Sequence, residues 1–289
     1  MQMRSSTYRL FACLAVVALA GLPMEAAADD LGSCVKQSDD LAVAGCSRAI
    51  DSHQYTGRSL ARLYARRGGA YQAQGDLDHA IADFNESMRV DPTYPAAYNN
   101  RGTTWYRTGD LDRAIADFDQ AIQLDPKYGY AYVNRGNARG TKGDLDRAIA
   151  DFDHAIRLDP KDAEAYYNRG SAWKAKGDLD RAIADFDQTI RLDPKYGYAY
   201  VNRGSAWGTK GDLDRAIADF DQAIRLDPKD PKAYYNRGTA WEMKGSLQEA
   251  LADFKMHSQL APSDPDGLEA VERVSKELSA SDGTARPRA

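Results

Sequence analysis

Histidines, cysteines and paired aspartates are the side chains of this 289-residue chain that could carry catalysis or bind a metal. Catalysis needs a nucleophile, a base and an oxyanion or metal site that converge in one place. The Asp-x-Asp runs lack the glycine and glutamate of a calcium loop, and the sequence has no phosphate-binding glycine loop. Four histidines occupy four different kinds of position: His53, His79, His154 and His257. The pattern therefore predicts a protein that is not an enzyme and has no metal site or cofactor.

The N-terminal segment up to Ala28 has the features of a secretory signal peptide. Two early arginines precede an apolar run from Leu10 to Leu22, and three alanines end at Ala28. This run is shorter than the roughly 20 residues that a membrane-spanning helix needs. We therefore expect cleavage after Ala28, a periplasmic or secreted mature chain, and no membrane insertion after cleavage. An uncleaved N-terminal anchor is the alternative.

Cleavage would leave two cysteines, Cys34 and Cys46, in an oxidising compartment. A bridge between them would close a loop of about a dozen residues and contribute on the order of 2 to 3 kcal/mol to stability. The spacing is not Cys-x-x-Cys, and no histidine cluster accompanies it. A structural disulfide is therefore favoured over a redox pair or a metal site.

The elements that must position any binding residue repeat along the chain with a constant period. The pair Arg-Gly marks this period six times, at Arg67-Gly68, Arg101-Gly102, Arg135-Gly136, Arg169-Gly170, Arg203-Gly204 and Arg237-Gly238. A fixed period of this length indicates stacked copies of one supersecondary unit rather than a single globular core. Function is therefore expected on a repetitive surface and not in one pocket.

Each copy has the pattern of a helical hairpin. In the copy that starts at Pro95, apolar residues from Leu111 to Ile122 recur at spacings of three and four, as on an amphipathic helix. Gly109 suits the left-handed residue that closes a first helix, and Asp110 suits the N-cap of a second. The Asp-Pro pair at residues 125–126 then ends the second helix, because proline cannot continue it.

This pattern resembles the tetratricopeptide repeat family, in an exported bacterial form. The aromatic, glycine, alanine, phenylalanine and proline positions of the family are matched in this copy by Tyr98, Gly102, Trp105, Ala114, Phe118, Ala121 and Pro126. The resemblance implies an all-α fold, a right-handed α-solenoid of stacked helix-turn-helix hairpins. It covers six repeats, at residues 61–94, 95–128, 129–162, 163–196, 197–230 and 231–264.

The flanking segments are expected to close the two ends of the stack. Residues 29–60, where Ala49-Ile50 echoes Ala121-Ile122, are interpreted as a degenerate N-terminal helical cap. Residues 265–280 carry one apolar stripe on a charged helix and suit a C-terminal capping helix. Residues 281–289 are expected to be a disordered tail.

In the tetratricopeptide repeat family, the first helices of successive repeats line the concave side of the superhelix. Carrying the inward-facing positions over to this chain selects one asparagine per repeat from the second repeat onward: Asn100, Asn134, Asn168, Asn202 and Asn236. Repeat one has Arg66 instead. The resemblance, notably to the repeats of O-linked N-acetylglucosamine transferase, implies that such a row binds the backbone of an extended polypeptide. Asparagine is a poor helix former, and its amide offers both a donor and an acceptor.

A structural use of the asparagines is the alternative. A unit of two repeats has been duplicated, since Lys-Tyr-Gly-Tyr-Ala-Tyr-Val-Asn-Arg-Gly occurs twice, so the five asparagines are not independent observations. They would then bond to neighbouring helices. Other residues expected to contact a bound peptide on the same face are Tyr130, Tyr167, Tyr198, Tyr235 and Lys174. Gly140 and Gly208 alternate with Lys174 and Glu242 at equivalent positions, which would leave small gaps for partner side chains.

The charge pattern argues against nucleic acid as a partner. The formal net charge is −5, and Lys and Arg alternate with Asp along the second helices, which is typical of a solvated face. The repeated arginine, exemplified by Arg101, is expected to pair with an aspartate of its own hairpin such as Asp117, although a clamp for C-terminal carboxylates is the alternative.

Two functions follow from the sequence. The favoured one is a protein–protein interaction scaffold or adaptor that binds an extended polypeptide in the concave groove. The alternative is a structural component of an envelope complex that assembles through the repeat ends or the convex face. The sequence does not determine the oligomeric state.

Overall fold

The computed structural model describes Cys34 and residues 39–284, and within them it contains fourteen α-helices and no strand. The predicted signal peptide, residues 1–28, lies outside the described residues, as do residues 285–289. The helices are α2 (Asp39–Asp51), α3 (Gly57–Gln74), α4 (Leu77–Val90), α5 (Pro95–Arg107), α6 (Leu111–Leu124), α7 (Gly129–Thr141), α8 (Leu145–Leu158), α9 (Ala163–Ala175), α10 (Leu179–Leu192), α11 (Gly197–Thr209), α12 (Leu213–Leu226), α13 (Pro231–Met243), α14 (Leu247–Leu260) and α15 (Pro265–Thr284).

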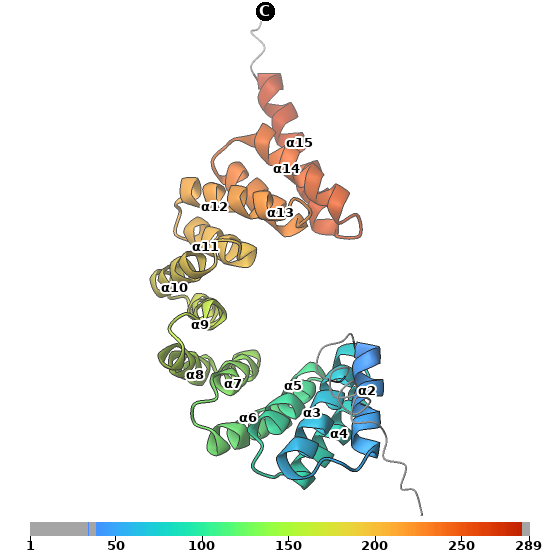
Figure 1. The fold of residues 1–289 in the computed structure, drawn as a ribbon. Helices are drawn as coiled ribbons and strands as arrows, with labels where there is room; N and C mark the ends of the chain where they lie inside the picture. Colours follow the sequence, from blue (N-terminus) through green and yellow to red (C-terminus); the bar gives the residue numbers. More distant parts are fainter. Residues whose placement is uncertain (1–33, 35–38, 285–289) are drawn as a thin grey trace, which may run out of the picture.

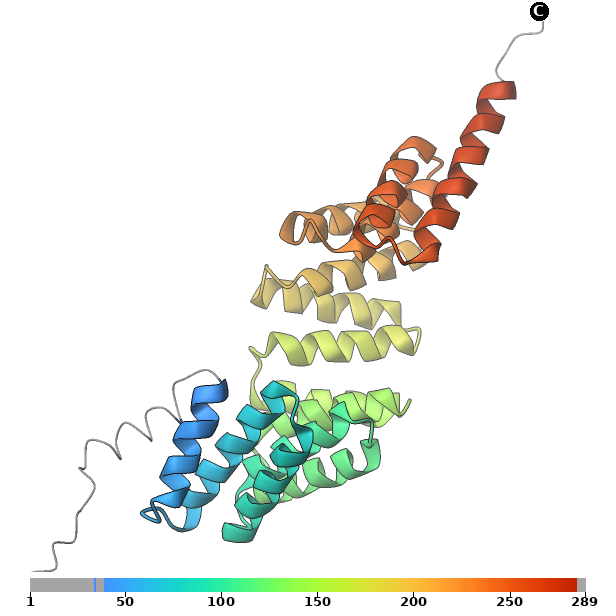
Figure 2. The same cartoon turned by 90° about the vertical axis from the view of Figure 1, so that its right-hand side faces the viewer.

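Six helical hairpins, from α3/α4 to α13/α14, stack into a curved solenoid (Figure 1). The first helices of the central hairpins, α7, α9 and α11, lie on the inner side of the curve, and the second helices lie outside (Figure 1). Consecutive first helices contact one another directly. The view in Figure 2 shows the hairpins as successive layers, with α15 projecting from the last layer. The expected all-α solenoid of stacked hairpins is thus confirmed.

The turn inside each hairpin follows from two residues. Gly109 has a φ of +83°, which a glycine adopts without the steric cost that a Cβ would bring. Asp110 then caps α6, because its Oδ1 accepts a hydrogen bond from the backbone N–H of Arg113 at 3.0 Å. The same pair of conformations recurs at each Gly-Asp turn, so the sequence motif itself sets the hairpin geometry.

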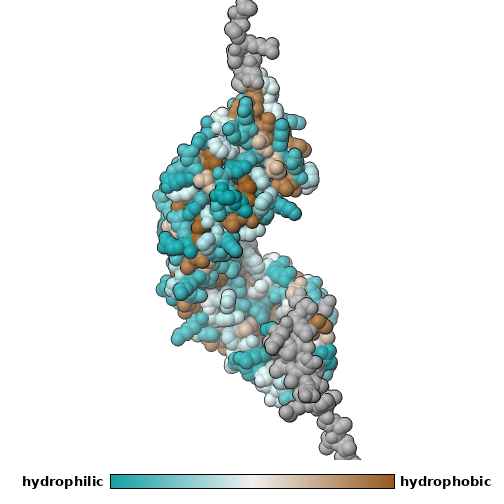
Figure 3. Space-filling model, turned by 45° about the horizontal axis from the view of Figure 1, so that its top comes forward, coloured by the Kyte–Doolittle hydropathy of each residue, from teal (hydrophilic) through white to brown (hydrophobic). Residues whose placement is uncertain are grey.

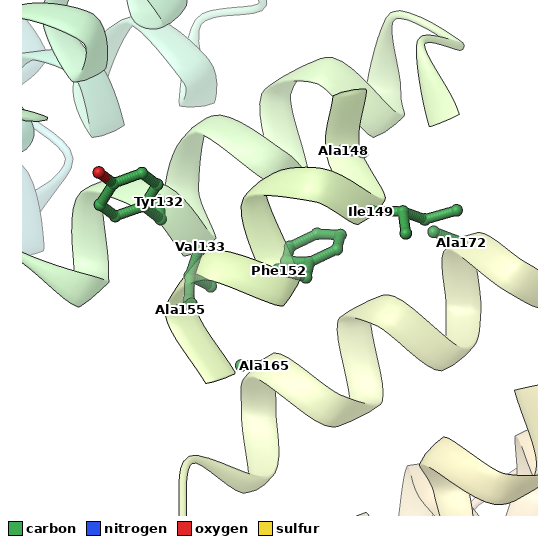
Figure 4. Close-up of a cluster of buried hydrophobic side chains, with 8 residues drawn as sticks. All are labelled: Tyr132, Val133, Ala148, Ile149, Phe152, Ala155, Ala165 and Ala172. Atoms are coloured by element: carbon green, nitrogen blue, oxygen red, sulfur yellow. The ribbon is translucent and has the colours of Figure 1, made fainter. Parts of the chain in front are cut away.

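Buried apolar clusters extend from one hairpin into the next. Phe152 of α8 packs against Gly136 of α7, where a Cβ would lie only 2.6 Å from the ring. In the cluster of Figure 4, Val133 of α7 and Ile149 and Phe152 of α8 are joined by Ala165 of α9. Since each hairpin shares its buried residues with the next one, no single repeat forms a complete core.

The repeated arginine pairs inside the protein. Arg135 donates from Nε and Nη2 to both carboxylate oxygens of Asp151, at 3.1 and 2.6 Å, and from Nη1 to Asp119 in the preceding hairpin at 2.6 Å. Equivalent two-oxygen pairs are Arg67–Asp83, Arg101–Asp117, Arg169–Asp185, Arg203–Asp219 and Arg237–Asp253. The expected hairpin pair is present in all six repeats, which leaves these arginines unavailable as a carboxylate clamp. Arg139, which replaces an aromatic family position, joins the same network through Asp151 at 2.8 Å.

At the N-terminal end, α2 packs against α3, and Cys34 and Cys46 form a disulfide. The structure differs from the predicted boundary at residues 60 and 61, because α3 begins at Gly57 and the boundary falls inside this helix. Neither proline nor glycine interrupts the chain between Arg58 and Ala61, and Leu60 packs against the cluster around the disulfide.

At the C-terminal end, α15 packs against α14 and continues to Thr284, past the predicted end at residue 280. Its sequence has no proline or glycine between Leu268 and Gly283, so nothing local stops the helix earlier. The helix docks closely because Gly267 faces the buried His257 ring, where a Cβ would have no space.

Candidate functional site

The asparagine row, Asn100, Asn134, Asn168, Asn202 and Asn236, lies on the first helices α5, α7, α9, α11 and α13. Each of these side chains is half-buried, so none is a freely solvated surface residue. Their helices line the inner side of the solenoid (Figure 1). The structure therefore places the predicted residues on five successive first helices of the solenoid.

Hydrogen bonds divide the row into two kinds of position. Asn134 donates to Asn99 Oδ1 of the preceding repeat at 2.9 Å. Asn202 donates to the Tyr167 hydroxyl of the preceding repeat at 3.0 Å and accepts from Lys174 Nζ at 2.9 Å. These two asparagines, which lie two repeats apart, therefore hold neighbouring repeats together, as the structural alternative supposes.

The asparagines of the alternate repeats differ. Asn168 Nδ2 is buried and has no hydrogen-bond partner among the described residues. Asn99 and Tyr167, which bond to Asn134 and Asn202, are replaced one repeat later by Val133 and Val201. Valine offers no side-chain acceptor. Asn236 is the sequence equivalent of Asn168, and the preceding repeat has Val201 where Asn202 has Tyr167 as its partner.

The four predicted tyrosines also fall into two pairs. Tyr130 and Tyr198 are 72% and 68% exposed, so their rings are free to contact a ligand. Tyr167 and Tyr235 are half-buried and pack against Phe186 and Phe254, with ring centroids 5.9 and 5.4 Å apart. Tyrosine rings of the first kind give contact area with a polar tip, whereas the second kind stabilises the hairpin.

Burial changes the ionisation of two groups beside the row. It raises the pKa of Tyr196 to about 12, and this ring packs on Tyr167 with a centroid distance of 5.0 Å. Burial also lowers the pKa of Lys174, whose ammonium group donates to Asn202. Lys174 is therefore partly a structural bridge between α9 and α11 rather than a free contact for a ligand.

A pocket at the N-terminal end of the inner surface was not predicted. It has a volume of about 410 Å³ and is lined by Arg62, Arg66, Tyr94 and Asn100 among others, with no acidic residue in its lining. Arg66 Nε donates to the backbone carbonyl of Cys34 at 2.9 Å, and Cys34 forms part of the wall. The break in the asparagine series at Arg66 is the signal in the sequence that marks this end as different.

One face of the molecule is mostly hydrophilic (Figure 3). On the face seen in Figure 3, hydrophobic residues lie in small separate patches between hydrophilic ones. No group of three or more His, Cys, Asp or Glu side chains in the described residues is arranged to hold a metal ion. Of the helices that the structure describes, none combines the length and apolar character of a membrane span.

Several solved structures share this fold at low sequence identity. A chain of the APC/C hetero-tetramer Cut9-Hcn1 matches with a TM-score of 0.67 and 18% identity over 81% of this chain, which spans 48% of that one. YrrB, described as a tetratricopeptide repeat protein with an unusual peptide-binding site, matches with a TM-score of 0.54 and 23% identity over 65% of this chain and 97% of that one. A tetratricopeptide repeat protein from Parabacteroides merdae matches with a TM-score of 0.64 and 18% identity, over 87% and 98% of the two chains.

Family models agree with the structural likeness. No curated protein matches the chain significantly. Models described as tetratricopeptide repeat match residues 95–128, 133–197 and 201–265, and one described as TPR repeat matches residues 68–109. These matches cover most of the six hairpins seen in the structure, and the chain belongs to the tetratricopeptide repeat family.

Proposed function

We propose that this chain is an exported, non-enzymatic adaptor that holds an extended segment of a partner protein along the inner surface of the solenoid. Members of its family generally mediate protein–protein interactions, and the structurally similar YrrB is described as having a peptide-binding site. Its proposed ligand is a polypeptide and not a nucleic acid, because no basic track follows the repeats.

The buried amide nitrogen of Asn168, which has no partner among the described residues, is the observation that carries this proposal. A buried donor without an acceptor costs about 1–3 kcal/mol, so the position is stabilised when a ligand carbonyl accepts its hydrogen bond. Peptide carbonyls recur along any extended polypeptide, and the asparagines recur along the solenoid. Binding should therefore depend little on the amino-acid sequence of the partner, since its backbone carbonyls are the acceptors.

Export is supported by the disulfide between Cys34 and Cys46, because such bonds persist in oxidising compartments. The predicted signal peptide with cleavage after Ala28 remains part of this proposal. N-terminal sequencing of the mature chain, isolated from its own cell envelope or medium, tests it. A chain that still begins at Met1 in the cytoplasm would contradict export.

Affinity enrichment from the cell envelope fraction tests the binding surface. The bait is the mature chain, compared with a variant in which the five residues of the asparagine row are changed to alanine. A control variant carries substitutions on exposed second-helix residues instead, with alanine at Asp112, Asp146, Asp180 and Asp214, each more than 80% exposed. Circular dichroism first establishes that all three proteins fold.

Partners lost from the asparagine variant and kept by the control would support binding on the inner surface. Partners kept by the asparagine variant and lost from the control would instead favour the alternative function, assembly through the convex face. Analytical ultracentrifugation distinguishes the two functions independently. A structural envelope component that self-assembles should associate in a concentration-dependent way, whereas an adaptor should remain monodisperse.

A further inference from the structure

Two hollows on the inner surface are copies of each other. The first, of about 300 Å³, lies between α7 and α9 and includes Gly140 and Asn168 in its lining. The second, of about 340 Å³, lies between α11 and α13 and includes Gly208 and Asn236. Every lining residue of the second lies two repeats after a lining residue of the first, so we name the pair the glycine gaps.

The two glycines are not required by the packing of the hairpins. A Cβ at Gly140 would meet only the Ala148 Cβ at 3.8 Å, and a Cβ at Gly208 only the Ala216 Cβ at 3.8 Å, which are ordinary contacts. Neither glycine has a positive φ. Glycine lowers the stability of a helix relative to alanine. Gly140 and Gly208 therefore reduce the stability of the protein, and the packing of the hairpins does not explain their presence.

At the equivalent position of the other four repeats, a long side chain crosses to the following element. The bonds are Gln72 Nε2 to Thr104 Oγ1 at 3.1 Å, Tyr106 to the Thr141 hydroxyl at 3.1 Å, Lys174 to Asn202 at 2.9 Å, and Glu242 to Arg273 at 2.9 Å. Gly140 and Gly208 replace these bridges with open volume. The same alternation leaves Asn168 without a partner among the described residues, so the missing bridge and the unbonded amide coincide at one place.

The lining of the gaps selects an uncharged occupant. Phe152 and Leu145 contribute apolar surface to the first gap, as Phe220 and Leu213 do to the second. Among the described residues, no charged side chain lines either gap. The neighbouring hollows around Tyr130 and Tyr198, in contrast, include Lys and Asp side chains. An apolar side chain can enter a gap without desolvating an ion, and the asparagine in the lining can bond to the ligand backbone.

We propose that the partner is an extended polypeptide with two apolar anchor side chains, of leucine to phenylalanine size, one seated in each glycine gap. This inference rests on the proposed function and adds the residues that select the partner. Packed helices lie about 8–10 Å apart, axis to axis. The path from one gap to the other crosses two such distances if only first helices are counted, and four if every helix is counted. A separation of about 16 to 40 Å corresponds to roughly 5 to 12 residues of extended chain.

Selection from a display library of random linear 16-residue peptides tests this proposal. The baits are the mature chain, Gly140→Leu, Gly208→Leu, and a control Gly69→Leu. At Gly69 a Cβ would have no heavy atom within 4 Å, and this residue lies on α3, outside both gaps. Leucine is expected to be tolerated at residues 140 and 208 because Tyr106 and Lys174 occupy the equivalent positions, and circular dichroism verifies folding.

The mature chain and the control are expected to enrich peptides with two apolar positions at one fixed separation. Gly140→Leu should remove the preference at one of these positions, and Gly208→Leu the preference at the other. Each substitution should weaken binding of a selected peptide about tenfold or more in fluorescence anisotropy, because loss of one anchor residue has effects of this size. Identical motifs in all four selections, with affinities within twofold, would overturn the role of the gaps.

A fifth bait separates this inference from the proposed function. It carries alanine at Asn100, Asn134 and Asn202, which do not line the gaps. Peptides that bind less tightly to this variant and equally well to both glycine variants would support inner-surface binding and overturn the anchors. Peptides affected only by the glycine variants would support the anchors and count against Asn100, Asn134 and Asn202 as ligand contacts. No enrichment by the mature chain would overturn both.

Discussion

Arg169 and Asp185 form a two-oxygen ion pair between the two helices of one hairpin, with Nε–Oδ2 and Nη2–Oδ1 distances of 2.9 and 2.6 Å. The third guanidinium nitrogen of Arg169 donates to Asp153 of the preceding hairpin at 2.5 Å. These hydrogen bonds raise the pKa of Arg169 above its ordinary value, so the arginine is charged at every physiological pH. One side chain thus joins three helices, and the equivalent arginines do so along the stack.

Replacing Arg169 with alanine is expected to destabilise the protein by about 2–4 kcal/mol, because the carboxylate of Asp185, only 8% exposed, would lose its partner. Urea unfolding followed by circular dichroism measures the change. Lys176→Ala is the control, since Lys176 pairs with Asp146, which is 83% exposed, and such surface pairs contribute about 0–1 kcal/mol. Equal effects of the two substitutions would contradict the structural role of Arg169.

Replacing each of two glycines of α7 with alanine, in separate variants, should have opposite effects on the free energy of unfolding. Gly136→Ala places a Cβ 2.6 Å from the Phe152 ring and should cost about 1–3 kcal/mol. Gly140→Ala has space, and it should stabilise the protein by about 0.5–1 kcal/mol through helix propensity. The change in the free energy of unfolding of each variant is measured from the midpoint of its urea unfolding curve, provided that the dependence on urea concentration (the m-value) is unchanged. A destabilising Gly140→Ala would show that the gap has a packing role after all.

Changing both Cys34 and Cys46 to alanine is expected to destabilise the N-terminal end by about 2–3 kcal/mol, because the disulfide closes a loop with a sequence separation of 12. The loss should be local, since each hairpin contacts mainly its neighbours. Hydrogen exchange with mass spectrometry should show faster exchange in α2 and the start of α3. Exchange in α11 and α12 serves as the internal control, and uniform acceleration along the chain would contradict a local role.

Acid should weaken the hairpin turns. Hydrogen bonds from the N–H groups at the helix start and from a neighbouring arginine lower the pKa of Asp110, Asp178 and Asp212. Because the folded-state pKa lies below the unfolded one, this stabilisation is complete above about pH 4 and is lost as the pH falls through the folded value. The melting temperature is therefore expected to fall between about pH 4 and pH 2.

A triple variant with asparagine at residues 110, 178 and 212 keeps the capping acceptors and removes the charges. Its melting temperature should vary less with pH over the same range than that of the unmodified chain. Asp219 acts in the opposite direction, because burial raises its pKa despite the pair with Arg203. It is the same in both proteins and therefore cancels from the comparison. Parallel pH profiles would rule out the capping aspartates as the source of acid sensitivity.

The sequence predicts well the features that depend on spacing within one repeat. Gly109 and Asp110 define a turn because the left-handed residue and the N-cap are adjacent in the chain. The Arg101–Asp117 pair is equally predictable, since a hairpin of fixed length brings residues 16 apart in the sequence side by side. The same spacing places all five members of the asparagine row on the first helices of their hairpins.

Contacts between repeats required the tertiary structure. Asn134 and Asn168 are identical in sequence position, yet the first bonds to Asn99 across the interface and the second faces a repeat with valine at that position. Tyr130 is exposed, whereas Tyr167, at another position of its repeat, packs against Phe186. A side chain's position within its repeat is determined by local helix geometry, whereas its hydrogen-bond partner depends on which residue the neighbouring repeat places within about 3 Å.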